Sequence, residues 1–149
     1  MYNSVQAVKS FVKSVASLPS SVVVLIAINN LLSPHDLSID WQDYKSLINH
    51  LLRRGCFVYV CQLLPVANIK KRDLYQSDLG RFNFYINNLR FKSNVKVISF
   101  EPIFMQNNSV NPAMYCPRVS NRPDFIHPNS RGLLCMHLMH QQLISVVCV

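Results

Sequence analysis

The sequence predicts a mixed α/β fold built on a parallel sheet. Apolar runs rich in β-branched residues occur at 21–28, 56–63 and 95–100, and each is apolar throughout rather than alternating. This pattern is typical of strands buried on both faces. Helical patterns separate the runs, and the links are short. Repeated strand–helix–strand units of this kind predict a parallel sheet with helices on both faces, in three α/β/α layers.

The helices follow from the spacing of apolar residues. A stripe from Trp41 to Leu52 predicts a helix over 40–54, which Gly55 ends. A second stripe through Leu79, Phe82, Ile86 and Leu89 predicts a helix over 75–91. A first helix is expected over 4–17 and a last one over 130–146. The proline-rich stretch 101–128 is expected to be an irregular loop, and most aromatic residues are expected in the core.

Composition limits the class of protein. The 149 residues are 50% hydrophobic, which fits a single domain over 1–149 with a core of its own. The longest apolar run, 22–28, is far shorter than the roughly 20 residues of a membrane-spanning helix, so no membrane partner is expected. Five cysteines without paired spacing indicate reduced thiols, and we therefore expect an intracellular, cytoplasmic protein.

Polar residues and loops follow the predicted strands. Asn29 comes after the first strand, Pro65 and Val66 after the second, and Glu101 after the third. The segment 123–129, PDFIHPN, lies on the loop that returns over the same edge. Because function gathers where parallel strands end, these segments are expected to converge on one site.

Several of these segments together resemble the SGNH (GDSL-type) hydrolase superfamily. They are AINN at 27–30, GCFVYVCQLLPV at 55–66, FNFYINNL at 82–89, VKVISFEPIF at 95–104 and DFIHPNSRG at 124–132. The most specific element is Asp-x-x-His-Pro-Asn followed by glycine. The resemblance implies a flavodoxin-like fold of which this chain holds only the last three of five strands.

The resemblance also implies roles for individual residues. His127 corresponds to the base that takes the proton of a serine nucleophile, and Asp124 to the residue that orients and stabilises the imidazole. Asn29 corresponds to the side-chain donor to the oxyanion. No cofactor or metal is implied.

The departures from the family pattern matter as much. The family's glycine before the asparagine is Ala27 here, and the aspartate after it is Asn30. The Gly-Asp-Ser block that carries the serine occurs nowhere in the sequence, so the chain supplies no nucleophile of this kind. We expect a partial domain, truncated at its N-terminal side: either a serine segment lies upstream and completes it, or the chain is a non-catalytic remnant or binding module.

The missing neighbour has a physical consequence for the strand at 21–28. In the family this strand pairs with the serine-bearing strand, and without that partner it forms an uncharged apolar edge. Unprotected edges of this kind pair with other chains. We therefore expect the isolated chain to aggregate, to pair with another chain (self-association) along the edge at 21–28, or to be one segment of a longer product.

Two further groups of residues invite a chemical interpretation. Cys116 precedes Asp124 closely enough to be an alternative nucleophile, since a thiolate beside a protonated histidine is activated; a plain, partly buried thiol is the preferred interpretation. Cys135, His137 and His140 suggest a metal site, but only the two histidines share a helix face. Zinc sites need firmer spacing, so ordinary helix positions are preferred.

The positive charge offers a further interpretation. Fifteen Lys and Arg against seven acids give a net charge of +8. Five cations gather at the N-terminal edge of the predicted sheet, where they complement helix dipoles or bind the phosphates of RNA or DNA; they are Arg53, Arg54, Arg90, Lys92 and Lys96. A loop cluster, 70–72, lies instead on the side of Asp124 and His127, where it would meet an anionic substrate. No exposed aromatic stacking platform is expected.

Two functions therefore remain open. The first is an SGNH-type esterase or acyl-hydrolase ancestry, inactive in these 149 residues unless an upstream serine segment completes it for an ester substrate. The second is a non-catalytic nucleic-acid-binding or interaction module of the same fold. SGNH-like domains that lost catalysis and bind RNA are known among Oskar-type germ-plasm proteins, and esterase domains of the superfamily occur in retrotransposon reading frames.

Overall fold

The computed structural model describes residues 4–33 and 35–145. These residues form two compact units, each described by itself. The first contains residues 1–63 and 74–98, and the second contains residues 64–73 and 99–149. The single-domain prediction therefore stays a prediction, while the site segments distribute between the two units.

The first unit holds the predicted parallel sheet. Its strands are β1 (Ser21–Val24), β2 (Phe57–Cys61) and β3 (Val95–Ile98), in the order β1-β2-β3, and both pairings are parallel. The mixed α/β class is thus confirmed. β2 is central and is the most buried strand, with Val58 and Val60 fully inaccessible, as the uninterrupted apolar run indicates.

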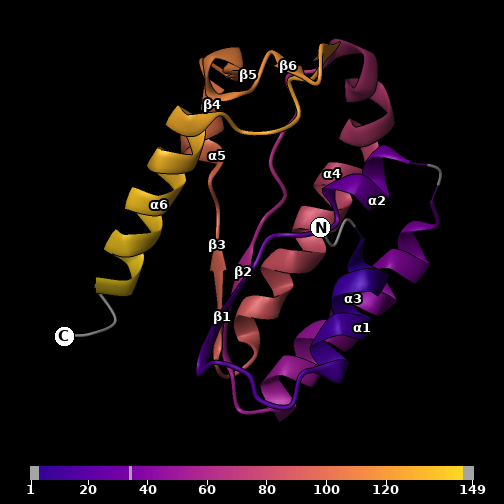
Figure 1. The fold of residues 1–149 in the computed structure, drawn as a ribbon, viewed down its shortest axis with the longest axis vertical. Coiled ribbons are helices and arrows are strands. Elements are labelled where there is room, and N and C mark those ends of the chain that lie inside the picture. The colour runs from indigo at the N-terminus through magenta and orange to yellow at the C-terminus, as the bar shows by residue number, and fades with distance from the viewer. Residues whose placement is uncertain (1–3, 34, 146–149) are drawn as a thin grey trace. The chain divides into compact units, whose positions relative to one another are not determined.

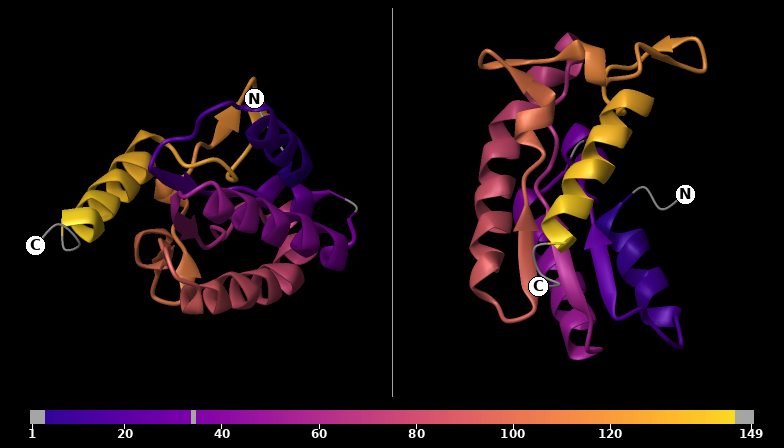
Figure 2. Two further views of the ribbon diagram at one scale, coloured as in Figure 1. Left: turned by 90° about the horizontal axis from the view of Figure 1, so that it is seen from below. Right: turned by 90° about the vertical axis from the view of Figure 1, so that its left-hand side faces the viewer.

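Three long helices cover one face of this sheet, as Figures 1 and 2 show. They are α1 (Val5–Ser14), α3 (Leu37–Arg53) and α4 (Ile69–Asn88), the last followed by the short 3₁₀ turn η1 (Leu89–Phe91). Tyr44, Phe82 and Ile86 from α3 and α4 are completely buried between them. The remaining long helix, α6 (Ser130–Ser145), belongs to the second unit, so the predicted helical layer on the second face stays a prediction.

The strands are shorter than their apolar runs. The run at 21–28 is a strand only as far as Val24, because Ala27 takes a left-handed conformation with φ 90° and the short helix α2 (Ile28–Leu32) begins after it. β1 is one of the two edge strands of the three-stranded sheet, and Val23 on it is 49% exposed. The second and third runs likewise end two residues early, at Cys61 and Ile98.

The stretch 101–128, expected to be irregular, contains regular structure in the second unit. It forms α5 (Glu101–Phe104), η2 (Pro112–Met114) and two short hairpins. The hairpins are β4 (Met105–Gln106) with β5 (Ser109–Val110), and β6 (Arg118–Val119) with β7 (Arg122–Pro123). Each turns on two residues with positive φ, Asn107–Asn108 and Ser120–Asn121, the conformation that tight hairpins require.

The structure describes four of the five cysteines. Cys56, Cys61, Cys116 and Cys135 are free thiols, and burial raises the pKa of Cys61 to about 12. A buried thiol with so high a pKa is inert.

In the described part of the chain, no helix has the length and apolar character needed to cross a membrane.

Candidate functional site

The sequence-predicted Asp–His pair forms in the second unit. His127 Nδ1 lies 2.8 Å from Asp124 Oδ1, and the backbone N–H groups of Ile126 and His127 donate to Asp124 Oδ2 over 3.2 and 2.9 Å. Phe125, between them, has φ 53°, which folds the chain back so that one carboxylate receives all three bonds. The motif Asp-x-x-His is thus a local turn that makes its own pair.

The electrostatics of the pair favour an ionised aspartate. Asp124 is buried, and burial alone would raise its pKa, but the hydrogen bonds from His127 and Ile126 outweigh burial and lower it. The His127 side chain is 61% exposed. With Nδ1–H donating to the carboxylate, Nε2 carries the lone pair, which is the tautomer of a general base.

Two neighbouring segments hold this turn in place within the second unit. The side chain of Asn68 donates to the Asp124 carbonyl over 2.6 Å, and the N–H groups of Ala67 and Asn68 donate to the Phe125 carbonyl. On its other side, the Cys116 N–H donates to the His127 carbonyl over 2.8 Å. The expected meeting of the loop after the second strand with the segment 123–129 is therefore confirmed.

The rest of the HPNSRG stretch is structural. Asn129 precedes α6, and its Oδ1 accepts from the N–H of Gly132 over 3.0 Å, so it caps the helix. Its Nδ2 donates to the carbonyl of Ala113 over 2.7 Å. A Cβ on Gly132 would lie 2.6 Å from the Met114 carbonyl oxygen, so only glycine fits. The motif therefore positions the histidine and starts the helix that follows it.

The alternative nucleophile and the metal cluster gain no support from geometry. The thiol of Cys116 is directed at the Pro128 carbonyl, 3.5 Å away, rather than at the imidazole. His137 on α6 is exposed. Within the part of the chain that the structure describes, no group of three or more His, Cys, Asp or Glu could hold a metal ion.

The remaining residue of the family site, Asn29, lies in the first unit. It is exposed in the first turn of α2, directly after the turn at Ala27. A pocket of about 440 Å³ opens beside it within this unit, lined by Ser4, Gln6, Asn29, Asn30, Ser33, His35 and Asp40. Ala27, which stands where the family has glycine, occupies the left-handed conformation that glycine adopts without strain.

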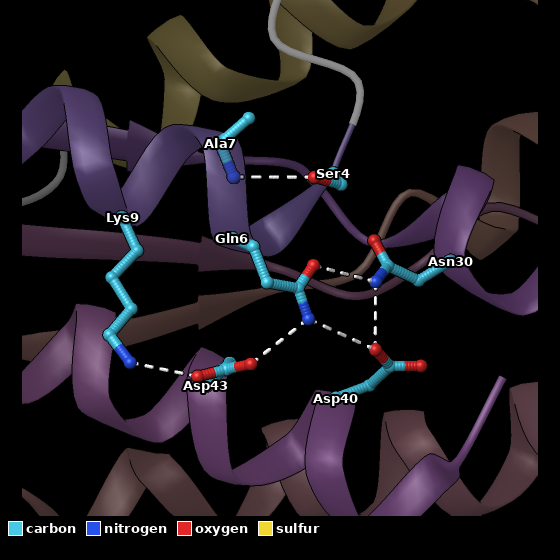
Figure 3. Close-up of polar contacts among 7 residues, drawn as sticks. All are labelled: Ser4, Gln6, Ala7, Lys9, Asn30, Asp40 and Asp43. Atoms are coloured by element: carbon cyan, nitrogen blue, oxygen red, sulfur yellow. Dashed lines mark hydrogen bonds and ion pairs between the residues drawn. The ribbon is translucent and has the colours of Figure 1, made fainter.

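Asn30 stands where the family has aspartate, and its contacts explain an amide there. Figure 3 shows its side chain between α1 and α3. Its Oδ1 accepts from the Val5 N–H over 3.2 Å, while its Nδ2 donates to Asp40 Oδ1 over 2.8 Å and to Gln6 Oε1 over 3.2 Å. Asp40 is 4% exposed, and its Oδ2 is buried without a hydrogen-bond partner among the described residues. A carboxylate at position 30 would repel it.

The predicted anion-binding cations lie in the first unit, where the strands begin. The register pairs Ser21 with Phe57 and Val58 with Val95, so the ends of α3 and η1 lie at the same edge of the sheet. Arg53, Arg54, Arg90 and Lys92 are exposed there, and Lys96 is half-buried on β3. These five residues, with Lys13 from the last turn of α1, are called the basic edge below.

Two members of the basic edge show how it is built. The guanidinium of Arg54 donates to the carbonyls of Val15 and Ala16 over 3.1 and 2.9 Å, so this arginine ties down the link after α1 as well as supplying charge. Partial burial, together with the nearby Arg54, Arg53 and Lys13, lowers the pKa of His50. The cations at the ends of α1 and α3 are therefore close enough together to act on the same histidine.

The acids of the first unit lie elsewhere. No acid occurs between 44 and 72 or between 79 and 100. Asp43 accepts from Lys9, Asp78 contacts His35, and Asp36 caps α3. The hydrogen bond from Lys9 and the more distant charge of Lys13 lower the pKa of Asp43, so Asp43 lies within electrostatic reach of one member of the basic edge. Charge is thus largely segregated within the unit, and among the described residues Arg53, Arg54, Arg90 and Lys92 take part in none of the ion pairs with acids.

Three phenylalanines among the described residues are exposed, although most aromatic residues were expected in the core. One of them, Phe11 of α1, is 44% exposed; the other two lie on α4 and η1. Phe84 is 64% exposed and Phe91 is 77% exposed. Phe82, Ile86 and Leu89 form the buried stripe of the same helix and turn. The sequence does contain a signal for the exposure of Phe84 and Phe91: these residues are seven positions apart, and neither lies on the apolar stripe that faces the core.

Comparisons with known proteins agree with this architecture. The C-terminal domain of the Drosophila Oskar protein is similar with a TM-score of 0.72 and 19% identity, over 87% of this chain and 64% of that one. A GDSL-like lipase from Bacteroides thetaiotaomicron is similar with a TM-score of 0.68 and 18% identity, over 87% of this chain and 63% of that one. Comparison with curated proteins gave no match.

These likenesses define the class as an SGNH-like α/β fold, as the sequence motifs predict. A family model described as the OSK domain matches residues 3–122. The chain therefore belongs to the OSK domain family. It spans less than two thirds of the length of the two solved structures, 64% and 63%.

Proposed function

We propose that this chain is a nucleic-acid-binding module of the OSK type, and that it binds RNA through the basic edge. The observation that carries the proposal is the segregation of charge in the first unit. Exposed cations gather where the strands begin, while its acids bind partners elsewhere. Phosphate contacts need such a surface, because release of counterions drives non-specific binding to RNA. DNA is the alternative ligand that the same charge would attract.

The test is salt-dependent RNA binding. For a single strand, each phosphate contact contributes about −0.7 to the slope of log Kobs against log salt. A variant with Lys13, Arg53 and Lys92 replaced by alanine should therefore reduce the slope by about 2 and weaken binding. The matched control, Arg118/Arg122/Arg131→Ala, removes three exposed cations from the second unit and should keep the slope. Equal losses in both variants would show binding by net charge rather than by the basic edge.

A second candidate, acyl-ester hydrolysis, is favoured by one specific observation. His127 Nδ1 lies 2.8 Å from Asp124 Oδ1, and hydrogen bonds lower the pKa of Asp124 despite its burial, which is the arrangement that a general-base histidine needs. If a serine from a segment outside this sequence is supplied, His127 Nε2 would take its proton as the hydroxyl attacks the ester carbonyl. Asp124 would stabilise the imidazolium that forms, as the family resemblance implies.

A fluorophosphonate probe separates the two candidates, because it labels an activated serine covalently. The 149-residue chain should stay unlabelled. A longer natural product that carries a serine segment should be labelled, and His127→Ala should abolish labelling. Labelling that persists in His127→Ala would overturn the catalytic assignment of this histidine.

A further inference from the structure

Phe84 and Phe91 lie on the same outer face of α4 and η1. They are seven positions apart, with four steps in α-helix and three in the 3₁₀ turn, so their directions differ by only about 40° and they lie roughly 12 Å apart along the axis. Both rings are mostly exposed, at 64% and 77%. Asn88, also exposed, lies between them. Large exposed phenylalanines in one row are uncommon on a surface that binds nothing.

Each ring has a cation beside it. The guanidinium carbon of Arg90 lies 4.9 Å from the centroid of the Phe91 ring. Arg81 is exposed three residues before Phe84, where helical side chains are neighbours. Lys92 is exposed directly after Phe91. An apolar protein partner would not favour this composition, whereas a ligand with flat bases and a phosphate backbone fits both the rings and the charges.

The ring of Phe84 is also supported from below. It packs against Tyr85 with centroids 6.2 Å apart, and Tyr85 packs against Trp41 of α3 at 5.2 Å. A side chain held in this way loses little freedom when a base stacks on it. No acid occurs between 79 and 100 to repel a phosphate.

We propose that this row, Arg81, Phe84, Asn88, Arg90, Phe91 and Lys92, is a stacking platform for single-stranded nucleic acid. Bases stack on Phe84 and Phe91, the cations contact the phosphates, and the Asn88 amide hydrogen-bonds a base edge. The platform rests on the proposed RNA binding, and it specifies the substrate class as single-stranded. A duplex hides the faces of its bases and cannot use the two rings.

The experiment compares ligands with the same phosphates but different access to bases. A fluorescently labelled 12-nucleotide oligouridine is titrated by anisotropy beside an abasic 12-mer and a 12-base-pair RNA duplex. The intact protein should bind oligouridine more tightly than the abasic strand. Because stacking on one aromatic side chain changes affinity by about 5- to 150-fold per base, Phe84→Leu and Phe91→Leu should each remove a factor in this range for oligouridine.

The same titrations include controls for charge and for the chemical change. The leucine variants should leave abasic and duplex binding unchanged, and they should keep the slope against salt, because no phosphate contact is lost. Phe11→Leu makes the same chemical change at an exposed phenylalanine of α1, 44% exposed, and should have no effect on oligouridine. Thermal unfolding of each variant confirms that the surface change leaves the fold intact.

The outcomes separate the two proposals. Equal affinity for oligouridine and the abasic strand, with both leucine variants like wild type, overturns the platform while salt-dependent RNA binding stands. Absence of binding to any of the three ligands overturns the RNA-binding proposal and the platform with it. Photocrosslinking of 4-thiouridine to peptides containing Phe84 or Phe91 gives an independent positive result, and crosslinks only to the second unit contradict the platform.

Discussion

Replacing Asn30 by aspartate should destabilise the protein strongly, although the two side chains have the same shape. The amide Nδ2 of Asn30 donates to Asp40 Oδ1 over 2.8 Å and to Gln6 Oε1 over 3.2 Å. The substitution removes both bonds, worth about 1 kcal/mol each. It also places two carboxylates about 4 Å apart, which costs up to about 4 kcal/mol at an effective dielectric constant of 20. Asn30 is only half-buried, so water screens part of this repulsion, and the expected total is about 3–5 kcal/mol.

Urea unfolding followed by tryptophan fluorescence measures this change, since Trp41 lies on α3 one residue after Asp40. With a slope of about 2 kcal/mol per molar urea, the midpoint should fall by about 2 M. Asn30→Ala removes the bonds without adding charge and should cost only about 1–2 kcal/mol. Asn29→Asp makes the same change at the exposed neighbour and should stay within about 0.5 kcal/mol. If Asn30→Asp is no less stable than Asn30→Ala, the account of the Asn30 contacts is wrong.

Four further predictions concern single residues. Ala27→Gly should raise the free energy of unfolding by about 0.5–1 kcal/mol, because Ala27 has φ 90°; a loss measured in urea would refute strain at this turn. Burial opposes the charged form of His35, but hydrogen bonds to the Ser33 carbonyl and Asp78 outweigh it and raise the pKa of this histidine. Protonated His35 should therefore stabilise the protein fully below about pH 6.5, and this stabilisation should be lost as pH rises through the raised pKa. If the free energy of unfolding of His35→Gln falls equally over the same pH range, this prediction is wrong. The pKa of Asp124 is lowered, so Asp124→Asn should be less stable than wild type above about pH 4, with the difference vanishing as pH falls further; equal urea midpoints at pH 7 would refute it. Val23→Lys should reduce concentration-dependent light scattering if the β1 edge self-associates, since charge protects an edge, and unchanged scattering would place any association elsewhere.

The sheet could be predicted because buried parallel strands leave an unambiguous record. The runs at 21–28, 56–63 and 95–100 contain β1, β2 and β3, and the helices predicted over 40–54 and 75–91 overlap α3 and α4. α4 begins earlier than predicted, at Ile69, so the stretch 70–72, expected to be a loop, belongs to this helix. The ends of the strands could not be predicted in the same way. Apolar residues continue past Val24 into the turn at Ala27 and on into α2. The apolar pattern is the same in the strand and in the turn, so it does not indicate where the backbone conformation changes.

The candidate site was only partly accessible from the sequence. Asp124 and His127 pair within one turn, so three positions of spacing suffice to find them. The role of Asn30 depends on α1 and α3 meeting at that residue, which no local pattern reveals. The exposure of Phe84 and Phe91 runs against the usual burial of aromatic residues, and only their position off the buried stripe of α4 and η1 indicates it.

The most direct test of RNA binding at the basic edge is the titration of His50 by NMR, with and without RNA. Arg53, Arg54 and Lys13, after burial, lower the pKa of this histidine in the free protein. Phosphates bound at the basic edge would neutralise those cations, so the pKa of His50 should rise when RNA binds. The pKa of His35, which lies in the same unit, serves as an internal reference and should not change. RNA that binds while the His50 titration stays unchanged would lie elsewhere on the protein, and the proposed interface would be wrong.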